Sequence, residues 1–222
     1  MKILDISHYQ NQSGKIDWNK VKTTEYKVCF VKCSEGIGWK DTFYDQNKKD
    51  ARNAGLLFGA YHFCRMNDPI KEAQYFCANV GDLQAGEIVI LDFEVDGTVD
   101  WCLKWLKEVE KQLGFKPILY TNEARVKSMD WKPVVDNNNG LWVAKYASTS
   151  IYVADYLQRS PVSGAWPFWA IWQYSSRASV SGIVGNVDVS VTKMDITTIK
   201  KYGKQIVCNH KCPLHCQPPI VN

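Results

Sequence analysis

The chain has 222 residues, of which 45% are hydrophobic, so it can bury a sizeable core within a single domain. Its formal net charge of +4 is spread along the sequence without a dense Lys/Arg run, which argues against a nucleic-acid partner. It also lacks an apolar run of about 18 residues, so no membrane span is expected.

Short apolar runs alternate with longer amphipathic stretches, a pattern typical of βα units around a mainly parallel sheet. In chain order, the expected strands are residues 3–7, 28–34, 57–63, 88–94, 117–121, 141–146, 168–174 and 183–189. Helical spacing covers residues 42–54, 69–80 and 99–113. Beyond Tyr120 the helical stretches are shorter and the loops richer in Asn, Ser and Pro. The sequence therefore predicts an α/β barrel whose second half is less regular.

Polar or aromatic side chains stand at the ends of these apolar runs. They are Asp5, Glu35, His62, Asp92, Glu94, Tyr120, Lys145, Gln173 and Asp188. The carboxyl ends of the strands of a βα barrel meet at one mouth, where the active site lies. We therefore expect acids, aromatic rings and one histidine around a single rim.

Asp92 and Glu94 are two residues apart on one expected strand, so their side chains share a face, roughly 6.5 Å apart along the backbone. A buried salt-bridge network is the structural alternative for such a pair. With Asp5 and Asp188 at the same rim we favour catalysis, because like charges in a desolvated cleft raise a pKa. A protonated acid can then donate to a glycosidic oxygen, and Glu94 has the longer reach.

Other chemistries have little support in the sequence. No HExxH, P-loop or GxGxxG motif occurs, and no Ser-His-Asp or Cys-His order falls on strand ends. Nine tryptophans and eleven tyrosines exceed what packing usually needs, and sugar rings stack well on aromatic faces. These observations favour carboxylate-catalysed hydrolysis of a carbohydrate without a required cofactor.

Nine segments together resemble the glycoside hydrolase family 25 lysozymes, the Chalaropsis-type muramidases that include phage endolysins. The segments are DISHYQ, IDWNKVK, FVKCSEG, AGLLFGAYHF, ILDFEV, GFKPILYT, LWVAKY, WQYSS and GNVDVSV, in order from Ile3 to about Val191. The resemblance implies an eight-stranded β/α barrel with a reduced helix set, (β/α)5(β)3. It also implies hydrolysis, with retention, of the β-1,4 bond between N-acetylmuramic acid and N-acetylglucosamine in bacterial peptidoglycan.

The resemblance also implies roles for individual residues. Glu94 corresponds to the general acid, Asp92 would tune it or orient the substrate's acetamido group, and Asp5 and Asp188 complete the acidic cluster. Tyr61 would stabilise a positively charged ring intermediate. The remaining residues expected to bind substrate are Tyr120, Trp142, Lys145, Lys32 and Glu35, for which ordinary packing is the alternative. A covalent and an acetamido-assisted mechanism both stay open.

Two rival functions remain at this stage. A chitinase-like barrel also carries a strand DxE, but here Ile88 and Ile90 occupy the earlier positions of its longer DxxDxDxE run. A non-catalytic carbohydrate-binding barrel would keep the aromatic residues without needing the acids. Because MKILDISHYQ lacks the apolar region of a secretory signal, we expect synthesis in the cytoplasm and action on the wall after release, as for a phage endolysin or an autolysin.

We divide the chain into a catalytic barrel at residues 1–199 and a Cys/His-rich tail at residues 200–222. Five cysteines lie in apolar segments and are expected to act as small hydrophobic residues: Cys29, Cys33, Cys64, Cys77 and Cys102. The tail holds five candidate metal ligands: Cys208, His210, Cys212, His215 and Cys216. A structural zinc, a disulfide-linked tail and a disordered tail are all compatible with this spacing. We expect no metal in the barrel itself, and the oligomeric state is left open.

Overall fold

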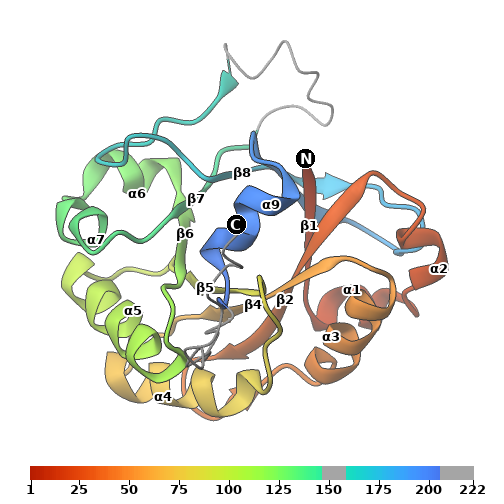
Figure 1. Cartoon of the computed structure of the whole chain (residues 1–222), viewed down its shortest axis with the longest axis horizontal. Coiled ribbons are helices and arrows are strands. Elements are labelled where there is room, and N and C mark those ends of the chain that lie inside the picture. Colours follow the sequence, from red (N-terminus) through yellow and green to blue (C-terminus); the bar gives the residue numbers. More distant parts are fainter. Residues whose placement is uncertain (147–158, 206–222) are drawn as a thin grey trace, which may run out of the picture.

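The computed structural model describes residues 1–146 and 159–205. Within these residues eight strands form a closed barrel in the order β1, β2, β4, β5, β6, β7, β8, β9, with β9 pairing back to β1 (Figure 1). The strands are β1 (Lys2–Ile6), β2 (Tyr26–Glu35), β4 (Leu57–Phe63), β5 (Ile88–Asp92), β6 (Ile118–Asn122), β7 (Leu141–Ala144), β8 (Ile171–Ala178) and β9 (Val187–Val191). The two-residue β3 (Trp39–Lys40) extends β2 as a hairpin. The predicted fold class is confirmed.

The last strand runs against the others. β1, β2, β4, β5, β6, β7 and β8 are parallel to their neighbours, whereas β9 pairs antiparallel with both β8 and β1. It also begins four residues later than predicted, at Val187. The expectation of a mainly parallel sheet therefore holds for the barrel, with β9 as its exception.

The three predicted helices are present as α3 (Tyr44–Asn53), α4 (Pro69–Val80) and α5 (Val99–Leu113). Their ends follow local chemistry: Thr98 accepts a hydrogen bond from the Trp101 amide at the start of α5, and Gly114 ends it at a φ of 80°. The shorter helices are α1 (His8–Ser13), α2 (Trp18–Val21), α6 (Glu123–Ser128), α7 (Lys132–Asp136), α9 (Ile196–Ile199) and the 3-10 turn η2 (Lys200–Tyr202). None of the helices in the described ranges is long and apolar enough to cross a membrane.

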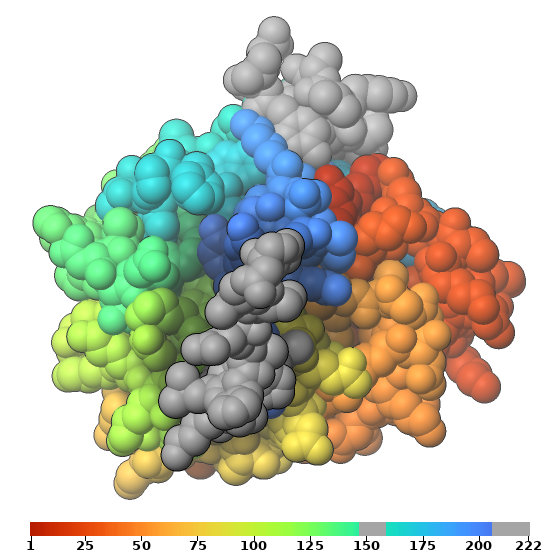
Figure 2. Space-filling model, in the orientation of Figure 1, coloured from red at the N-terminus to blue at the C-terminus, as the bar shows by residue number. Residues whose placement is uncertain are grey.

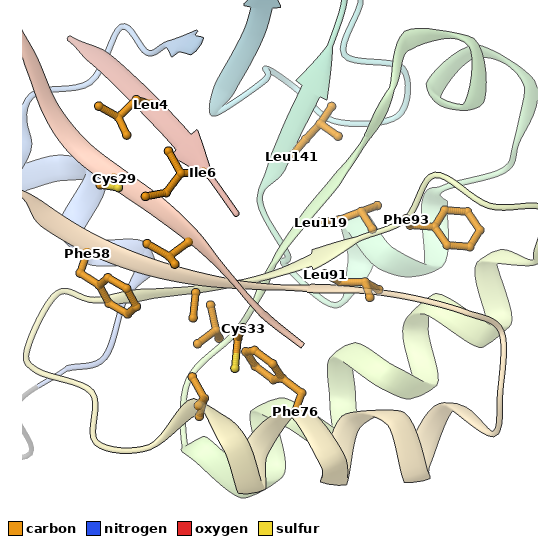
Figure 3. Close-up of a cluster of buried hydrophobic side chains, with 14 of the residues drawn as sticks. Leu4, Ile6, Cys29, Cys33, Phe58, Phe76, Leu91, Phe93, Leu119 and Leu141 are labelled. Carbon is orange, nitrogen blue, oxygen red and sulfur yellow. The ribbon is translucent and has the colours of Figure 1, made fainter. Parts of the chain in front are cut away.

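Alternate residues of each strand face two separate apolar layers. On β1, Leu4 and Ile6 face outward into the layer shared with the helices, which Figure 3 shows around Phe58 and Phe76. Ile3 faces inward and packs with the barrel interior. The five cysteines of the apolar segments belong to the outer layer as free thiols, four of them buried and Cys77 partly buried, so their predicted role as small hydrophobic residues is confirmed.

Gly59 on β4 is required by close packing inside the barrel. A Cβ atom at this position would lie 2.5 Å from a ring carbon of Phe30 on β2, far inside van der Waals contact. Phe30 in turn packs against Trp142 of β7, with ring centroids 4.9 Å apart. The missing side chain therefore allows one large ring to fill the middle of the barrel.

The segment after β9 closes the base of the barrel. In Figure 1 it lies across the middle of the ring of strands, and in Figure 2 it covers the centre of the same face. Ile199 and Tyr202 pack against the interior cluster. The Gly86 amide donates to the Lys204 carbonyl at 2.7 Å, and the Lys204 amide donates to the Glu87 carbonyl at 2.9 Å. Residues 200–205 are thus packed on the barrel, although the sequence assigned them to the tail. The Cys and His residues of the tail lie outside the described residues.

Candidate active site

The inward-facing side chains change from apolar to polar toward the carboxyl ends of the parallel strands, where they surround a cavity of about 190 Å³. Eight of the predicted site residues line it: Asp5, Lys32, Tyr61, Asp92, Glu94, Tyr120, Trp142 and Asp188. Five further lining residues are Ser7, Tyr9, Phe63, Tyr146 and Gln173. The structure therefore brings all four predicted acids to one cavity.

Asp92 is the last residue of β5, and Glu94 lies two residues beyond the strand. The prediction that the strand reaches residue 94 is therefore wrong. The alternation nevertheless continues, because the Phe93 amide donates to the Tyr120 carbonyl at 2.9 Å as a further rung toward β6. Phe93 is buried in the outer layer, so Asp92 and Glu94 both face the cavity.

Asp188 lies at the same mouth, although its strand runs in the opposite direction to the others. The sequence placed it at the end of a parallel strand, whereas it stands near the start of the antiparallel β9. The beginning of an antiparallel strand lies beside the ends of its parallel neighbours. Asp188 is therefore the direct cross-strand partner of Asp5.

Burial raises the pKa of every acid in the cluster, and repulsion by neighbouring acids raises the pKa of Asp5, Asp92 and Asp188 further. Desolvation followed by the charge of Asp188 raises the pKa of Asp5 well above its ordinary value, and desolvation followed by Glu94 does the same for Asp92. Desolvation and then Glu94 raise the pKa of Asp188 to about 6. The pKa of Glu94 is also raised, by desolvation, although the residue is exposed at the rim. The cluster thus favours shared protons over four separate charges.

Gln173 joins three sides of the cavity in one hydrogen-bond network. Its Nε2 donates to both carboxyl oxygens of Asp5, at 3.3 and 3.2 Å. Its Oε1 accepts from the Tyr120 hydroxyl at 2.7 Å and from the Tyr146 hydroxyl at 3.3 Å. The same Tyr120 hydroxyl also donates to Oε1 of Glu94, at 3.3 Å. The amide therefore holds the acid of β1 and two phenols in fixed positions.

Lys32 lines the cavity wall, and its ammonium group is bound by Glu35, which lies outside the cavity. Its Nζ donates to Glu35 at 2.5 Å and lies 4.9 Å from the ring centre of Phe63 and 5.0 Å from that of Trp39. Glu35 does not line the cavity and also pairs with Arg65. Burial opposes ionisation of Glu35, but the bonds from Lys32 and Arg65 outweigh it and lower its pKa. Glu35 thus contacts the site through Lys32.

Trp142 and Lys145, both expected to bind sugar, differ in position. Trp142 lines the cavity, where its indole nitrogen donates to the Ser190 hydroxyl at 3.0 Å and its ring packs 4.5 Å from that of Tyr120. Lys145 does not line the cavity: its Nζ lies 3.3 Å from Glu123 and donates to the Ser160 carbonyl at 3.2 Å. The geometry therefore places only Trp142 beside the acids.

His62 faces away from the cavity. It is fully buried in the outer layer, 2.9 Å from the Ser34 hydroxyl and 3.0 Å from Oε2 of Glu72, and it stacks on Trp105. Desolvation lowers its pKa. His62 is therefore a packed structural residue, and the expectation of a histidine at the rim is wrong.

Sequence reasoning did not assign a role to Ser7, Tyr9, Phe63, Tyr146 or Gln173. Gln173 had a signal, since it stands at the end of an apolar run, and Ser7 and Tyr9 stand two and four residues after Asp5. Tyr146 follows the end of β7 and had none beyond being aromatic. Within residues 1–146 and 159–205, no group of three His, Cys, Asp or Glu side chains has the geometry to hold a metal ion.

A barrel with a polar layer of acids and tyrosines at one mouth can be compared with known proteins. The family model described as "Glycosyl hydrolases family 25" matches residues 4–183. The chain belongs to this family. The prediction of a lysozyme-type glycoside hydrolase is confirmed at that level.

Relatives and solved structures agree with this assignment. The chain is 30% identical over 199 residues to lysozyme M1 of Streptomyces globisporus, an alignment that covers 83% of this chain and 65% of that protein. The structure of the CTP1L endolysin is 28% identical, with a TM-score of 0.73 and coverage of 92% and 71%. A bacterial lysozyme from Streptomyces coelicolor, at 23% identity and a TM-score of 0.72, covers 91% of this chain and 96% of that one and shows the shared fold. This family 25 chain thus spans about two thirds of the length of lysozyme M1.

Proposed function

We propose that this family 25 chain is a muramidase that hydrolyses the β-1,4 bond between N-acetylmuramic acid and N-acetylglucosamine in bacterial peptidoglycan. The supporting observation is the position of Glu94. It is the exposed member of a buried acid cluster, at the mouth of the cavity, with a raised pKa. An accessible carboxylic acid that keeps its proton is what a glycosidic oxygen needs as it leaves.

The other three acids support Glu94 in this proposal. Ionisation of Glu94 raises the pKa of Asp92 and of Asp188, so the acids of the cavity hold their protons as one coupled group. Asp92 is buried, and among the described residues its Oδ1 accepts no hydrogen bond, which leaves this oxygen for the substrate's acetamido group. Asp5 and Asp188 would face the positively charged ring that develops as the bond breaks.

Retention at the anomeric carbon is part of the proposal and is supported by the family relationship. Tyr61 lies in the cavity wall, where its hydroxyl can reach such a ring, and burial raises its pKa well above the ordinary value. Trp142 and Tyr120 supply aromatic surface beside it. Either a carboxylate or the substrate's acetamido oxygen can act as the nucleophile in this proposal. The reaction requires no cofactor, and the protein reaches the wall after release from the cytoplasm, as a phage endolysin or an autolysin does.

The binding-module alternative is disfavoured by the cost of the acid cluster. Four carboxyls with raised pKa values destabilise the fold, since each charged form is desolvated or repelled. A catalytic function explains why such a cost is kept, whereas glycan binding alone does not require it. The chitinase alternative lacks its earlier acids, because Ile88 and Ile90 are buried in the barrel interior. Neither rival has an observation of its own in the structure.

Glu94→Gln tests the proposal. The amide is nearly isosteric but cannot donate the required proton, so we expect turnover of purified peptidoglycan to fall by at least about 100-fold. The fold, measured by thermal unfolding, and binding to the glycan are expected to persist. Glu110→Gln on α5, which removes a carboxylate that pairs with Lys116 away from the cavity, is the matched control. Wild-type turnover by purified Glu94→Gln would refute the assignment.

A further inference from the structure

The catalytic cavity is too small for much of a polymer. Its volume is about 190 Å³, below the roughly 300–1,000 Å³ of ordinary ligand pockets. A glycan strand that places one linkage beside Glu94 must therefore continue over the outer surface of the barrel mouth. Side chains that hold these further sugars are to be sought next to the cavity rather than in it.

A row of three rings leads out of the cavity on the side of β1 and β2. Tyr9 lines the cavity and packs 4.1 Å from His8, measured between ring centres, and His8 meets the edge of Trp39 at 5.2 Å. We call these three residues the Tyr9 platform. Tyr9 is 64% exposed and Trp39 is 37% exposed, so the platform presents apolar ring surface to solvent.

The Tyr9 platform is fixed from beneath. The backbone amide of His8 donates to Oδ2 of Asp41 at 2.8 Å, and its Nδ1 lies 3.1 Å from the same oxygen. Asp41 is buried, and its own amide donates to the Cys33 carbonyl of β2 at 2.9 Å. The central ring is therefore anchored to the barrel, which positions Tyr9 before any ligand arrives. Preorganised aromatic surface loses little entropy when it binds.

The platform is also continuous with the catalytic site. Lys32, a wall residue of the cavity, lies with its Nζ 5.0 Å from the ring centre of Trp39, so the cavity wall and the outer end of the platform touch. Large exposed rings beside a binding cavity are typical of interaction surfaces rather than of ordinary protein surface. A sugar ring matches them because its C–H face is apolar and its hydroxyls remain in water at the edge.

We propose that the Tyr9 platform is an additional glycan subsite, which binds a sugar of the same strand outside the catalytic cavity by stacking on Tyr9. This inference rests on the proposed function, because the strand must be the substrate of the Glu94 site. The subsite makes binding depend on strand length. A short oligosaccharide that fills only the cavity gains little from the platform, whereas a long strand gains one stacking contact.

The test compares Tyr9→Ala with wild type on two substrates, the disaccharide of N-acetylmuramic acid β-1,4-linked to N-acetylglucosamine and long peptide-free glycan strands. We expect KM for the long strands to rise roughly 3- to 10-fold, the range of one aromatic contact, with kcat little changed and a smaller effect on the disaccharide. Tyr9→Phe keeps the ring and should restore the wild-type KM. Phe168→Ala is the matched control, since Phe168 is 58% exposed but lies at the base of the barrel beside Met194 and Tyr202.

Equal losses on both substrates, or none on the long strands, would overturn the subsite while leaving the muramidase assignment intact. If wild type releases no fragments from peptidoglycan, the proposed function fails first. Binding of the long strands by the Glu94→Gln protein then decides the platform separately. Weaker binding by the Tyr9→Ala, Glu94→Gln double variant would still support it, and unchanged binding would reject it.

Discussion

Arg125 touches the segment that carries Glu94 at three points. Its guanidinium donates to the main-chain carbonyl of Glu94 at 3.1 Å and to Asp96 at 3.1 Å, and it lies 5.3 Å from the ring centre of Phe93. Glu94 stands two residues beyond β5, so no strand pairing holds it directly. Arg125 is therefore a positioning residue for the proposed acid. Its positive charge also favours the carboxylate form of Glu94.

Arg125→Gln is expected to change the pH profile as well as the rate. Desolvation raises the pKa of Glu94, whereas Arg125 and the Tyr120 hydroxyl lower it. Loss of the cation therefore raises that pKa further, and because the acid must be protonated to act, the basic limb of the kcat/KM profile should move to higher pH. We expect the rate to fall about tenfold from looser positioning. Steady-state kinetics across the pH range measures both effects.

The control for this prediction is Lys127→Gln. Lys127 lies on the same helix, α6, and pairs with Glu123 rather than with the Glu94 segment. Its removal changes the net charge of the protein equally but should leave the basic limb in place. A basic limb that does not move in Arg125→Gln, or that moves equally in both variants, would show that Arg125 does not tune Glu94.

At this scale the sequence predicted the four acids but not the groups that hold them. Asp5, Asp92, Glu94 and Asp188 could be found because acids at the ends of apolar runs are unusual. The Gln173 network could not, because its partners Asp5, Tyr120 and Tyr146 come from distant parts of the chain and meet only when the barrel closes. Glu35 and Lys145 have the right residue types, yet their side chains turn toward other partners.

The loop between β4 and α4 is organised by one buried carboxylate of the helix. Glu72, in the first turn of α4, accepts the amides of Arg65 and Asn67 at 3.2 and 2.7 Å and contacts Nε2 of His62 at 3.0 Å. The residue is fully buried. Arg65 forms an ion pair with Glu35, and Glu35 forms a second ion pair with Lys32. The loop therefore connects helix α4 to the wall of the catalytic cavity.

Glu72→Gln should therefore destabilise the protein by about 2–4 kcal/mol. The glutamine keeps one oxygen for the amides of Arg65 and Asn67, but it loses the negative charge that strengthens these bonds, and its NH2 group replaces the oxygen that contacts Nε2 of His62. Urea unfolding followed by tryptophan fluorescence measures the loss. Asp100→Asn on α5 is the matched control, because its ion pair with Lys104 is exposed and should be worth less than about 0.5 kcal/mol. Equal stability of the two variants would contradict this account of the loop.

Helices and strands with a clear hydrophobic periodicity could be predicted from the sequence, but the direction in which a strand runs in the sheet could not. Helices α3, α4 and α5 follow from helical spacing and from local caps such as Thr98 and Gly114. A strand alternates with the same period in either direction, so the antiparallel course of β9 had no sequence signal. The end of β5 was also hidden, since Phe93 and Glu94 continue the alternation beyond the last paired residue.

The whole barrel has an open, polar mouth and a closed, apolar base. The acids and tyrosines line the mouth, while Ile199, Met194 and Tyr202 pack against the interior from the other end. Figure 2 shows this C-terminal segment covering the centre of its face. Sequence composition placed a boundary at residue 199, because the lysine-rich stretch that follows has no apolar alternation. Its packing depends instead on Tyr202 and on backbone bonds to Gly86 and Glu87.

A chain ending at residue 199 should accordingly be less stable than one ending at residue 205. It loses the Tyr202 ring and the two backbone hydrogen bonds of Lys204, which together should cost about 2–4 kcal/mol. Thermal and urea unfolding of both chains, beside the full chain, measures the difference. Equal stability of the two shortened chains would support the boundary at residue 199.

The most direct test of the central claim is to identify the new ends that the protein makes in purified peptidoglycan. Fragments released by wild type and by Glu94→Gln are reduced with borohydride and analysed by mass spectrometry. A muramidase that uses Glu94 gives reduced muramic acid ends with wild type and at most trace amounts with the variant. Reduced glucosamine ends would place the cut at the other bond, and no fragments from either protein would contradict the enzymatic account.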